Sequence, residues 1–108
     1  MREPVVAVDL HRVVVPLVRA HHAAHGTEDQ RDLVLVRVEL AGGSVGWGEC
    51  SALRRPTYTA EHTAGAWVVL RDELAPALLA GGLPAVVGHP MATAAVVEAL
   101  TDAVLRVE

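Results

Sequence analysis

Three histidines lie close together in one polar stretch and are the first candidates for acid/base or metal-binding chemistry. His21 and His25 are four residues apart, and His22 and His25 are three apart, so a helical turn would place a pair on one face. Two interpretations are open. The sequence favours a solvated polar loop; the alternative is a histidine site in a stand-alone enzyme, assisted by Glu49 or Tyr58.

Arginine provides all of the basic side chains. The nine basic residues are all arginines, which excludes a lysine Schiff base, a lysine general base and a P-loop lysine. Arg54 and Arg55 are adjacent in a stretch typical of an irregular loop. Such a pair can grip a substrate carboxylate through parallel hydrogen bonds, or it can remain exposed and hydrated. We favour the exposed and hydrated pair, because ion pairs between exposed side chains contribute little free energy.

The segment Gly46-Trp47-Gly48-Glu49-Cys50 is distinctive. Glycines on both sides of Trp47 predict a close backbone approach or a bulge, and we expect the indole to pack rather than to border a ligand. Cys50 has no neighbouring base and no CxxC partner, so we expect a buried thiol without chemistry. Glu49 lies in an otherwise apolar strand and is expected to be paired there.

Composition limits the classes of function. A chain of 108 residues is one domain, and 52% hydrophobic but only 3% aromatic residues predict a core of Val, Ala and Leu. The formal net charge of -4 argues against a nucleic-acid partner. A single cysteine allows no internal disulfide, and neither a signal-peptide pattern nor an apolar run of roughly twenty residues is found. We expect a cytoplasmic protein with no membrane contact.

The first half of the chain predicts three strands. Valines dominate residues 4–18, where Pro16 is expected to end the strand, to bulge or to lie at an edge. Residues 19–32 hold no apolar side chain larger than alanine and predict a mobile loop. Apolar and polar residues alternate over 33–40, two glycines follow, and 45–50 resumes the extended pattern, which predicts an antiparallel hairpin.

The second half predicts helices. Thr59 is a candidate cap for a helix over residues 60–74, and Pro76 is expected to break that helix or to begin a new first turn. Residues 91–107 repeat Ala, Val and Leu at helical spacing, and the alanines predict close helix packing. The predicted fold class is α+β, a three-stranded antiparallel β-meander followed by a helical hairpin.

Motifs spread over nearly the whole chain match one known family, and the Gly-Trp-Gly-Glu-Cys element is the most specific of them in this context. The matching residues are Leu10-His11-Arg12-Val13, Pro16-Leu17, Gly26-Thr27, Gly46-Trp47-Gly48-Glu49-Cys50, Pro56, Tyr58, Gly65-Ala66, Val69-Leu70-Arg71, Pro76-Ala77-Leu78-Leu79, Gly88-His89, Met91-Ala92 and Asp102-Ala103. With them the chain resembles the N-terminal capping domain of the enolase superfamily, nearest to the N-succinylamino acid racemase and o-succinylbenzoate synthase branch.

The resemblance implies a cap over the mouth of a modified TIM barrel, with residues 90–108 similar to the helix that leads from cap to barrel. In such enzymes the acid/base lysines and the three carboxylates that hold Mg²⁺ lie on barrel strands. This chain contains none of those strands, so we expect no cofactor in the chain itself. The implied partner is a barrel domain or subunit, and the implied role is substrate specificity and exclusion of water.

The resemblance also implies that two cap loops meet a small-molecule ligand. His21 and His25 stand where the family has aromatic residues, His22 where an arginine is common, and Leu53 at a substrate-facing apolar position. The chain is several helical turns shorter than the family over residues 79–88. The implied substrate-binding residues are His21, His22, His25, Ala52, Leu53, Arg54 and Tyr58.

A function of another class is the alternative. The cap fold would then act alone, as a small-molecule-binding protein or as a histidine-dependent isomerase or cyclase that uses His21, His22 and His25. Its last helix would be buried against a second copy in a homodimer. A continuation beyond Glu108 into strands bearing Lys-x-Lys would decide for the cap of a barrel enzyme.

Overall fold

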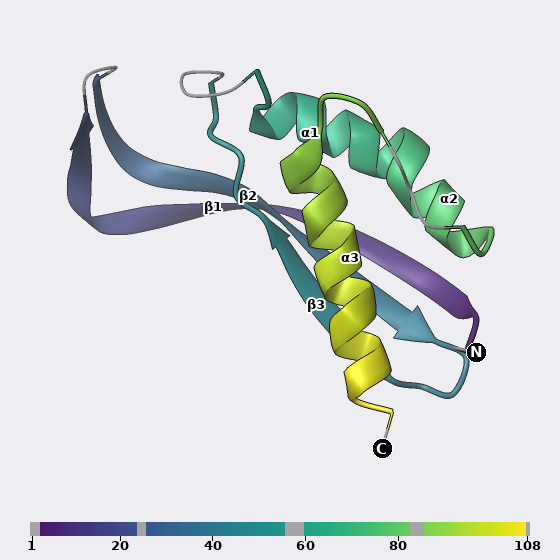
Figure 1. The fold of residues 1–108 in the computed structure, drawn as a ribbon. Helices are drawn as coiled ribbons and strands as arrows, with labels where there is room; N and C mark the ends of the chain where they lie inside the picture. Colours follow the sequence, from purple (N-terminus) through teal and green to yellow (C-terminus); the bar gives the residue numbers. More distant parts are fainter. Residues whose placement is uncertain (1–2, 24–25, 56–59, 83–85, 108) are drawn as a thin grey trace.

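The computed structural model describes residues 3–23, 26–55, 60–82 and 86–107, and the side chains of residues 17–29 lie outside this description. One antiparallel sheet holds β1 (Val5–Ala23), β2 (Gly26–Leu40) and β3 (Val45–Cys50) in the order β1-β2-β3. The helical elements that pack on it are α1 (Thr63–Val69), η1 (Leu70–Leu74), α2 (Ala75–Leu79) and α3 (Pro90–Leu105) (Figure 1). The predicted α+β class and the β-meander followed by helices are confirmed.

β1 and β2 form one long hairpin, longer than the sequence predicted. Antiparallel pairing begins with Val5 opposite Leu40 and continues to Ala23 opposite Gly26, so the loop predicted over residues 19–32 is largely strand. That prediction was wrong because the backbone ladder needs no apolar side chains, and a register set by the valine-rich part can extend through polar residues. Pro16 lies in an edge strand beside a register shift, as its missing N–H predicts.

The core lies between one face of the sheet and the helices, and it is aliphatic as the composition predicts. Alternate residues of β2, from Val34 to Leu40, are fully buried on this face. Leucines of the helical segment and small residues of α3 complete the core: Leu70, Leu74, Leu78, Ala92, Ala95, Val96, Ala99 and Ala103. The other face of the sheet carries half-buried and exposed residues.

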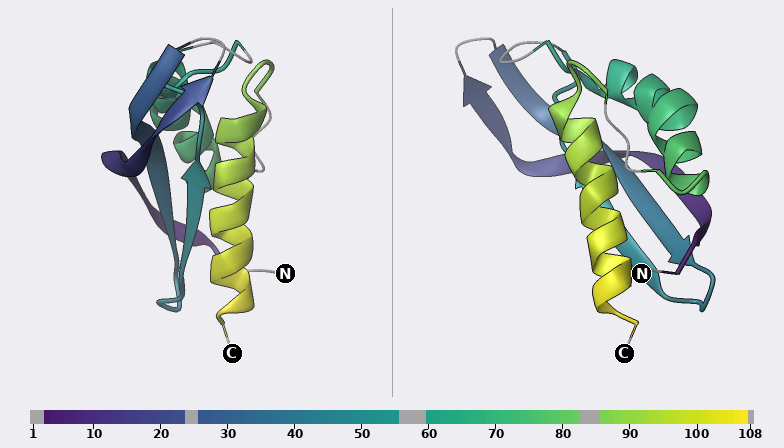
Figure 2. Two further views of the ribbon diagram at one scale, coloured as in Figure 1. Left: turned by 90° about the vertical axis from the view of Figure 1, so that its left-hand side faces the viewer. Right: turned by 45° about the vertical axis from the view of Figure 1, so that its right-hand side comes forward.

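α3 lies directly against the backbone of β3 (Figure 2). A Cβ atom on Gly48 would lie 2.0 Å from the carbonyl oxygen of Ala95, and one on Gly46 would lie 2.2 Å from that of Ala99. Only a residue without a side chain fits at either position. The close backbone approach predicted for these two glycines is therefore confirmed, and alanines on α3 provide the matching surface.

Trp47 and Glu49 alternate with these glycines and so lie on the open face of the sheet. Trp47 is 45% exposed, and its ring centroid lies 6.1 Å from that of His11. The indole thus packs on the sheet surface and does not enter the core. Glu49 accepts a hydrogen bond from Ser51 Oγ at 3.0 Å, so the expected partner is a hydroxyl group. Because the Glu49 side chain is exposed, its charge does not need this partner to offset a cost of burial.

Two carboxylates of α3 satisfy the outer edge of β3. The N–H of Trp47 donates to Asp102 Oδ2 at 2.9 Å, and the N–H of Glu49 donates to Glu98 Oε1 at 3.0 Å. Glu98 and Asp102 are four residues apart and lie on one face of the helix. Their hydrogen bonds occupy strand donors that would otherwise be open to pairing with another chain.

The hydrogen bond from Trp47, helped by Arg106, lowers the pKa of Asp102. A lowered folded-state pKa stabilises the fold above the unfolded-state pKa of about 4, and this stabilisation is lost as the pH falls through the folded-state pKa. We expect Asp102→Asn to be less stable than the wild type at pH 7, and we expect this difference to shrink as the pH falls below the unfolded-state pKa of about 4. Urea unfolding across this range measures it, with the exposed Glu73→Gln as control; a difference independent of pH would contradict the assignment.

Of the two outcomes predicted for Pro76, the structure shows the second, because the proline lies in the first turn of α2 and the helical segment is not broken. α1, η1 and α2 follow one another without interruption, and the N–H of Ala75 donates to the carbonyl of Leu70, five residues back. This wider π turn lies directly before the proline, where an ordinary helix would suffer a clash with the carbonyl four residues earlier. The segment begins at Thr63 with His62 as its N-cap. Thr59, the predicted cap, lies outside the described residues.

Candidate functional site

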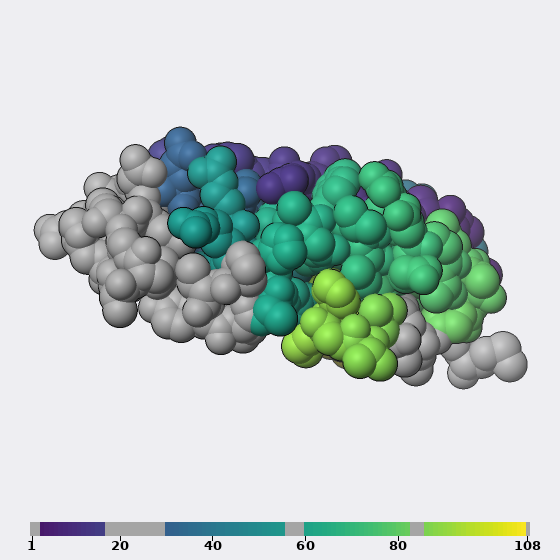
Figure 3. All heavy atoms as spheres, turned by 90° about the horizontal axis from the view of Figure 1, so that it is seen from above, coloured from purple at the N-terminus to yellow at the C-terminus, as the bar shows by residue number. Residues whose placement is uncertain are grey.

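The loop that follows β3 is well anchored at one end of the molecule, seen from above in Figure 3. Three consecutive carbonyl groups accept hydrogen bonds. Ser51 receives one from Arg31 Nη2 at 3.0 Å, Ala52 receives one from Thr63 Oγ1 at 2.9 Å, and Leu53 receives one from the Thr63 N–H at 2.9 Å. Because each of these backbone acceptors is occupied, the loop has a defined course from which its side chains project.

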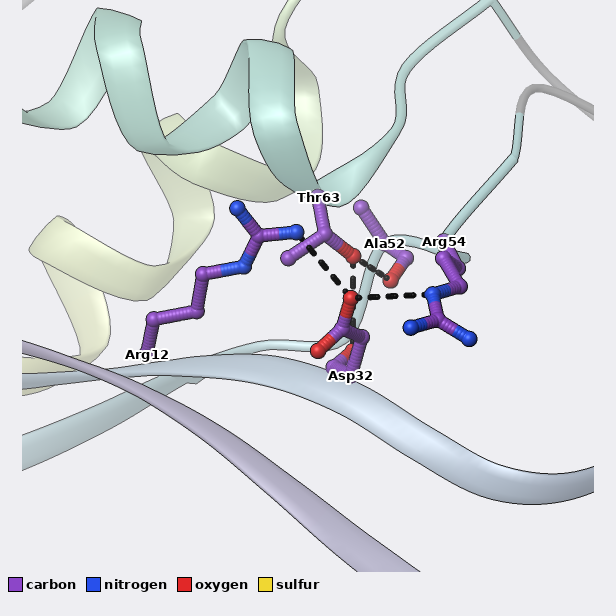
Figure 4. A network of polar contacts seen from close by, with 5 residues as sticks. All are labelled: Arg12, Asp32, Ala52, Arg54 and Thr63. Carbon is purple, nitrogen blue, oxygen red and sulfur yellow. Dashed lines mark hydrogen bonds and ion pairs between the residues drawn. The ribbon is translucent and has the colours of Figure 1, made fainter.

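A buried carboxylate lies beside this loop (Figure 4). The side chain of Asp32 is 5% exposed, and its Oδ2 accepts a hydrogen bond from Arg12 Nη2 at 3.1 Å. The same oxygen lies 3.7 Å from Arg54 Nε. Oδ1 is also buried and has no hydrogen-bond partner in the described part of the chain. A buried carboxylate is costly unless it is paired, so the two guanidinium groups offset the cost of burying Asp32.

Neither Asp32 nor Thr63 stood out as a functional candidate in the sequence. A signal for Asp32 was nevertheless present, since it continues the alternation of buried residues along β2 and so falls on the core face. A carboxylate in that position requires a partner. Its partners, Arg12 and Arg54, come from other strands and loops, and a period-2 pattern carries no information about which distant residues they are.

A second buried carboxylate, Glu61, holds the first turn of α3. Its Oε1 accepts a hydrogen bond from the N–H of Met91 at 2.9 Å, and its Oε2 accepts one from the N–H of Ala92 at 2.8 Å. These are first-turn donors that have no partner within the helix, and a negative charge is favoured there by the helix dipole. Glu61 thereby ties α3 to the segment that carries Thr63.

Three predicted site residues come together in the anchored loop. Ala52 is buried, Leu53 is half-buried, and the side chain of Arg54 is 68% exposed. Ala52 therefore contributes its backbone and its packing, whereas the side chains of Leu53 and Arg54 are open to solvent in part or for the most part. The exposed interpretation of the Arg54-Arg55 pair agrees with the exposure of both residues.

The structure describes only part of the predicted histidine cluster. His21 and His22 lie in β1 opposite residues 28 and 27, so their backbone is extended and does not form the helical turn that a pair of imidazoles on one helical face requires. His25 and Tyr58 lie outside the described residues.

Cys50 is 1% exposed, and burial raises the pKa of its thiol. The predicted buried position is confirmed, and a thiol kept protonated is a poor nucleophile. Within residues 3–16, 30–55, 60–82 and 86–107, no three His, Cys, Asp or Glu side chains are placed to hold a metal ion. In that same part of the chain no helix is long and apolar enough to cross a membrane.

Comparison with known proteins decides the family. Residues 6–108 match the model for the mandelate racemase / muconate lactonizing enzyme N-terminal domain. The chain belongs to this family. An N-succinylamino acid racemase from Amycolatopsis sp is 40% identical to this N-terminal domain in an alignment 109 positions long, which covers 92% of the chain and 29% of the racemase. The resemblance inferred from the motifs is confirmed.

Solved structures agree with this placement. A probable mandelate racemase from Alicyclobacillus acidocaldarius superposes with a TM-score of 0.73 at 36% identity, over 89% of this domain and 29% of that chain. The L-Ala-D/L-Glu epimerase from Bacillus subtilis superposes with a TM-score of 0.72 at 25% identity, over 90% of this domain and 30% of that chain. The N-terminal domain thus spans less than a third of the length of these relatives.

Proposed function

We propose that this N-terminal domain is the cap of an enolase-superfamily racemase and that it determines which substrate reaches a barrel active site. The observation that carries the proposal is the family match over residues 6–108 in a chain that contains no lysine. Acid/base chemistry by lysine is therefore beyond this chain, whereas an anchored loop with accessible Leu53 and Arg54 is suited to selecting a ligand. The reaction itself would be carried out by a barrel domain, in the same polypeptide or in a partner subunit.

The substrate class proposed is an N-acylated amino acid, and the reaction class is racemisation. The 40% identity to the Amycolatopsis N-succinylamino acid racemase supports this choice. We propose that the ligand is lined by His21, His22, His25, Ala52, Leu53, Arg54 and Tyr58. The compartment proposed is the cytoplasm, because the single cysteine forms no internal disulfide and is buried as a free thiol.

Exposed apolar side chains on α3 give further support for a covering partner. Met91, Val97, Val104 and Leu105 are each at least a third exposed, and Leu105 reaches 73%. A helix that shows apolar residues on both its core face and its outer face is typical of an element buried on both sides. A barrel packed on α3 would cover this outer face.

A domain exchange tests the function. The chain is fused to the barrel of the Amycolatopsis racemase in place of the segment it aligns with, and racemisation of N-succinyl and N-acetyl amino acids is measured. We expect the fusion to exceed the barrel alone by at least about tenfold in kcat/KM, because a cap excludes water and orients the substrate. The isolated chain should be inactive. Turnover by the isolated chain, or a fusion no better than the bare barrel, would overturn the proposal.

A further inference from the structure

Arg54 is held at the ligand-facing loop without using its hydrogen-bond donors. Its Nε lies 3.7 Å from Asp32 Oδ2, beyond hydrogen-bond length, and Asp32 accepts its hydrogen bond from Arg12 at 3.1 Å instead. In the described part of the chain no hydrogen bond from the Arg54 guanidinium is found, and the side chain is 68% exposed. The planar group is thus attracted to a buried charge and still free to donate to another oxyanion.

Asp32 attracts the Arg54 side chain and so holds it in place, but it does not occupy the hydrogen-bond donors of the guanidinium group. Its carboxylate is 5% exposed and fixed by Arg12, so it forms a stationary negative charge beside the loop. Thr63 fixes both the loop and the backbone of Asp32. Its Oγ1 donates to the carbonyl of Ala52 at 2.9 Å and also lies 3.4 Å from the carbonyl of Asp32. A fixed charge next to a fixed loop reduces the number of directions that a long arginine side chain samples, which lowers the entropy lost on binding.

Guanidinium groups gather around this loop although the whole chain has a net charge of -4. Arg12, Arg31, Arg54 and Arg55 all belong to the loop or to strand positions close to it, and Asp32 is the buried carboxylate among them. Two further carboxylates lie nearby, but Glu49 accepts its hydrogen bond from Ser51 Oγ and Glu61 accepts from the first N–H groups of α3, so neither occupies the donors of Arg54. The Arg54 guanidinium is therefore left to donate to an anionic group on the ligand.

We propose that Arg54 is a specificity-determining residue that binds a carboxylate remote from the reacting carbon, such as the distal carboxylate of an N-succinyl group, and that Asp32 is its positioning residue. This inference rests on the proposed function, since it identifies which N-acyl groups the cap accepts. A neutral acyl group of similar size offers Arg54 no oxyanion. The domain therefore prefers N-succinyl over N-acetyl substrates.

The fusion described above provides the test, with Arg54→Met, Asp32→Asn and the control Arg71→Met. Arg71 is also exposed and also paired with an aspartate, but it lies on η1. We expect Arg54→Met to lower kcat/KM for the N-succinyl substrate by about tenfold to a hundredfold, mainly through KM, and to change that for the N-acetyl substrate less than about twofold. Asp32→Asn should reduce the same preference by a smaller factor, Arg54→Lys should restore part of it, and Arg71→Met should leave both substrates unchanged.

The outcomes separate this inference from the proposed function. If the unmodified fusion is active and Arg54→Met lowers both substrates equally or neither, the assignment of Arg54 is wrong and the capping function stands. If Asp32→Asn alone leaves the preference unchanged, its positioning role is wrong. A fusion without activity on either substrate overturns both. Thermal unfolding of each variant distinguishes lost selectivity from lost folding, and the exposed Arg54→Met is expected to melt like the unmodified fusion.

Discussion

Gly48→Ala is expected to lower the free energy of unfolding by about 3 kcal/mol or more. The added Cβ would lie 2.0 Å from the carbonyl oxygen of Ala95 and 3.0 Å from the backbone nitrogen of Ala99. Backbone atoms of a helix cannot move individually, so α3 would have to shift away from β3 as a whole. That shift would weaken the hydrogen bonds to Glu98 and Asp102 and the alanine contacts along the helix.

Gly82→Ala is the matched control for this change. A Cβ on Gly82 would meet its nearest neighbour, the carbonyl oxygen of Ala77, at 3.4 Å, which is ordinary contact. Urea unfolding of both variants and of the wild type gives the comparison, and Gly46→Ala should resemble Gly48→Ala because its Cβ would lie 2.2 Å from the backbone of α3. Equal stability of Gly48→Ala and Gly82→Ala would mean that α3 and β3 do not approach as closely as described.

The close approach of α3 to β3 was predictable because its causes are local in the sequence. Glycines two residues apart in a strand share a face, and alanines spaced along a helix mark a face that admits a close neighbour. The β2–β3 hairpin was predictable for the same kind of reason, since alternation and the glycines near residue 43 are adjacent signals. Gly43 indeed has a φ of 100°.

The failures have in common that a distant part of the molecule decides the outcome. Residues 19–32 have the composition of a loop, yet pairing across the hairpin extends both strands through much of this stretch. The anchoring of the loop after β3 depends on Thr63 and Arg31, whose side chains reach carbonyl groups on another element.

Glu61→Ala is expected to lower the free energy of unfolding by about 3 kcal/mol, because two hydrogen bonds to a charged acceptor are lost at once. The N–H of Ala92 is buried and would be left without an acceptor. Glu61→Gln should cost at least about half as much, since a carboxamide has one acceptor oxygen and its NH₂ group faces a second N–H donor. Urea unfolding measures the stabilities, and the exposed Glu73→Ala is the control for loss of a carboxylate.

The position of Glu61, two residues before Thr63, gives this variant a second expected effect. Without Glu61, the hydrogen bonds to the N–H groups of Met91 and Ala92 are lost. The start of α1 is then less restrained, and Thr63 in that segment donates to the carbonyls of Ala52 and Leu53. Hydrogen exchange should therefore accelerate in Glu61→Ala both in the first turn of α3 and at the Thr63 N–H, and it should remain slow in the centre of β2. Acceleration confined to α3 would show that the anchored loop is independent of the helix and that Glu61 stabilises the first turn of α3 alone.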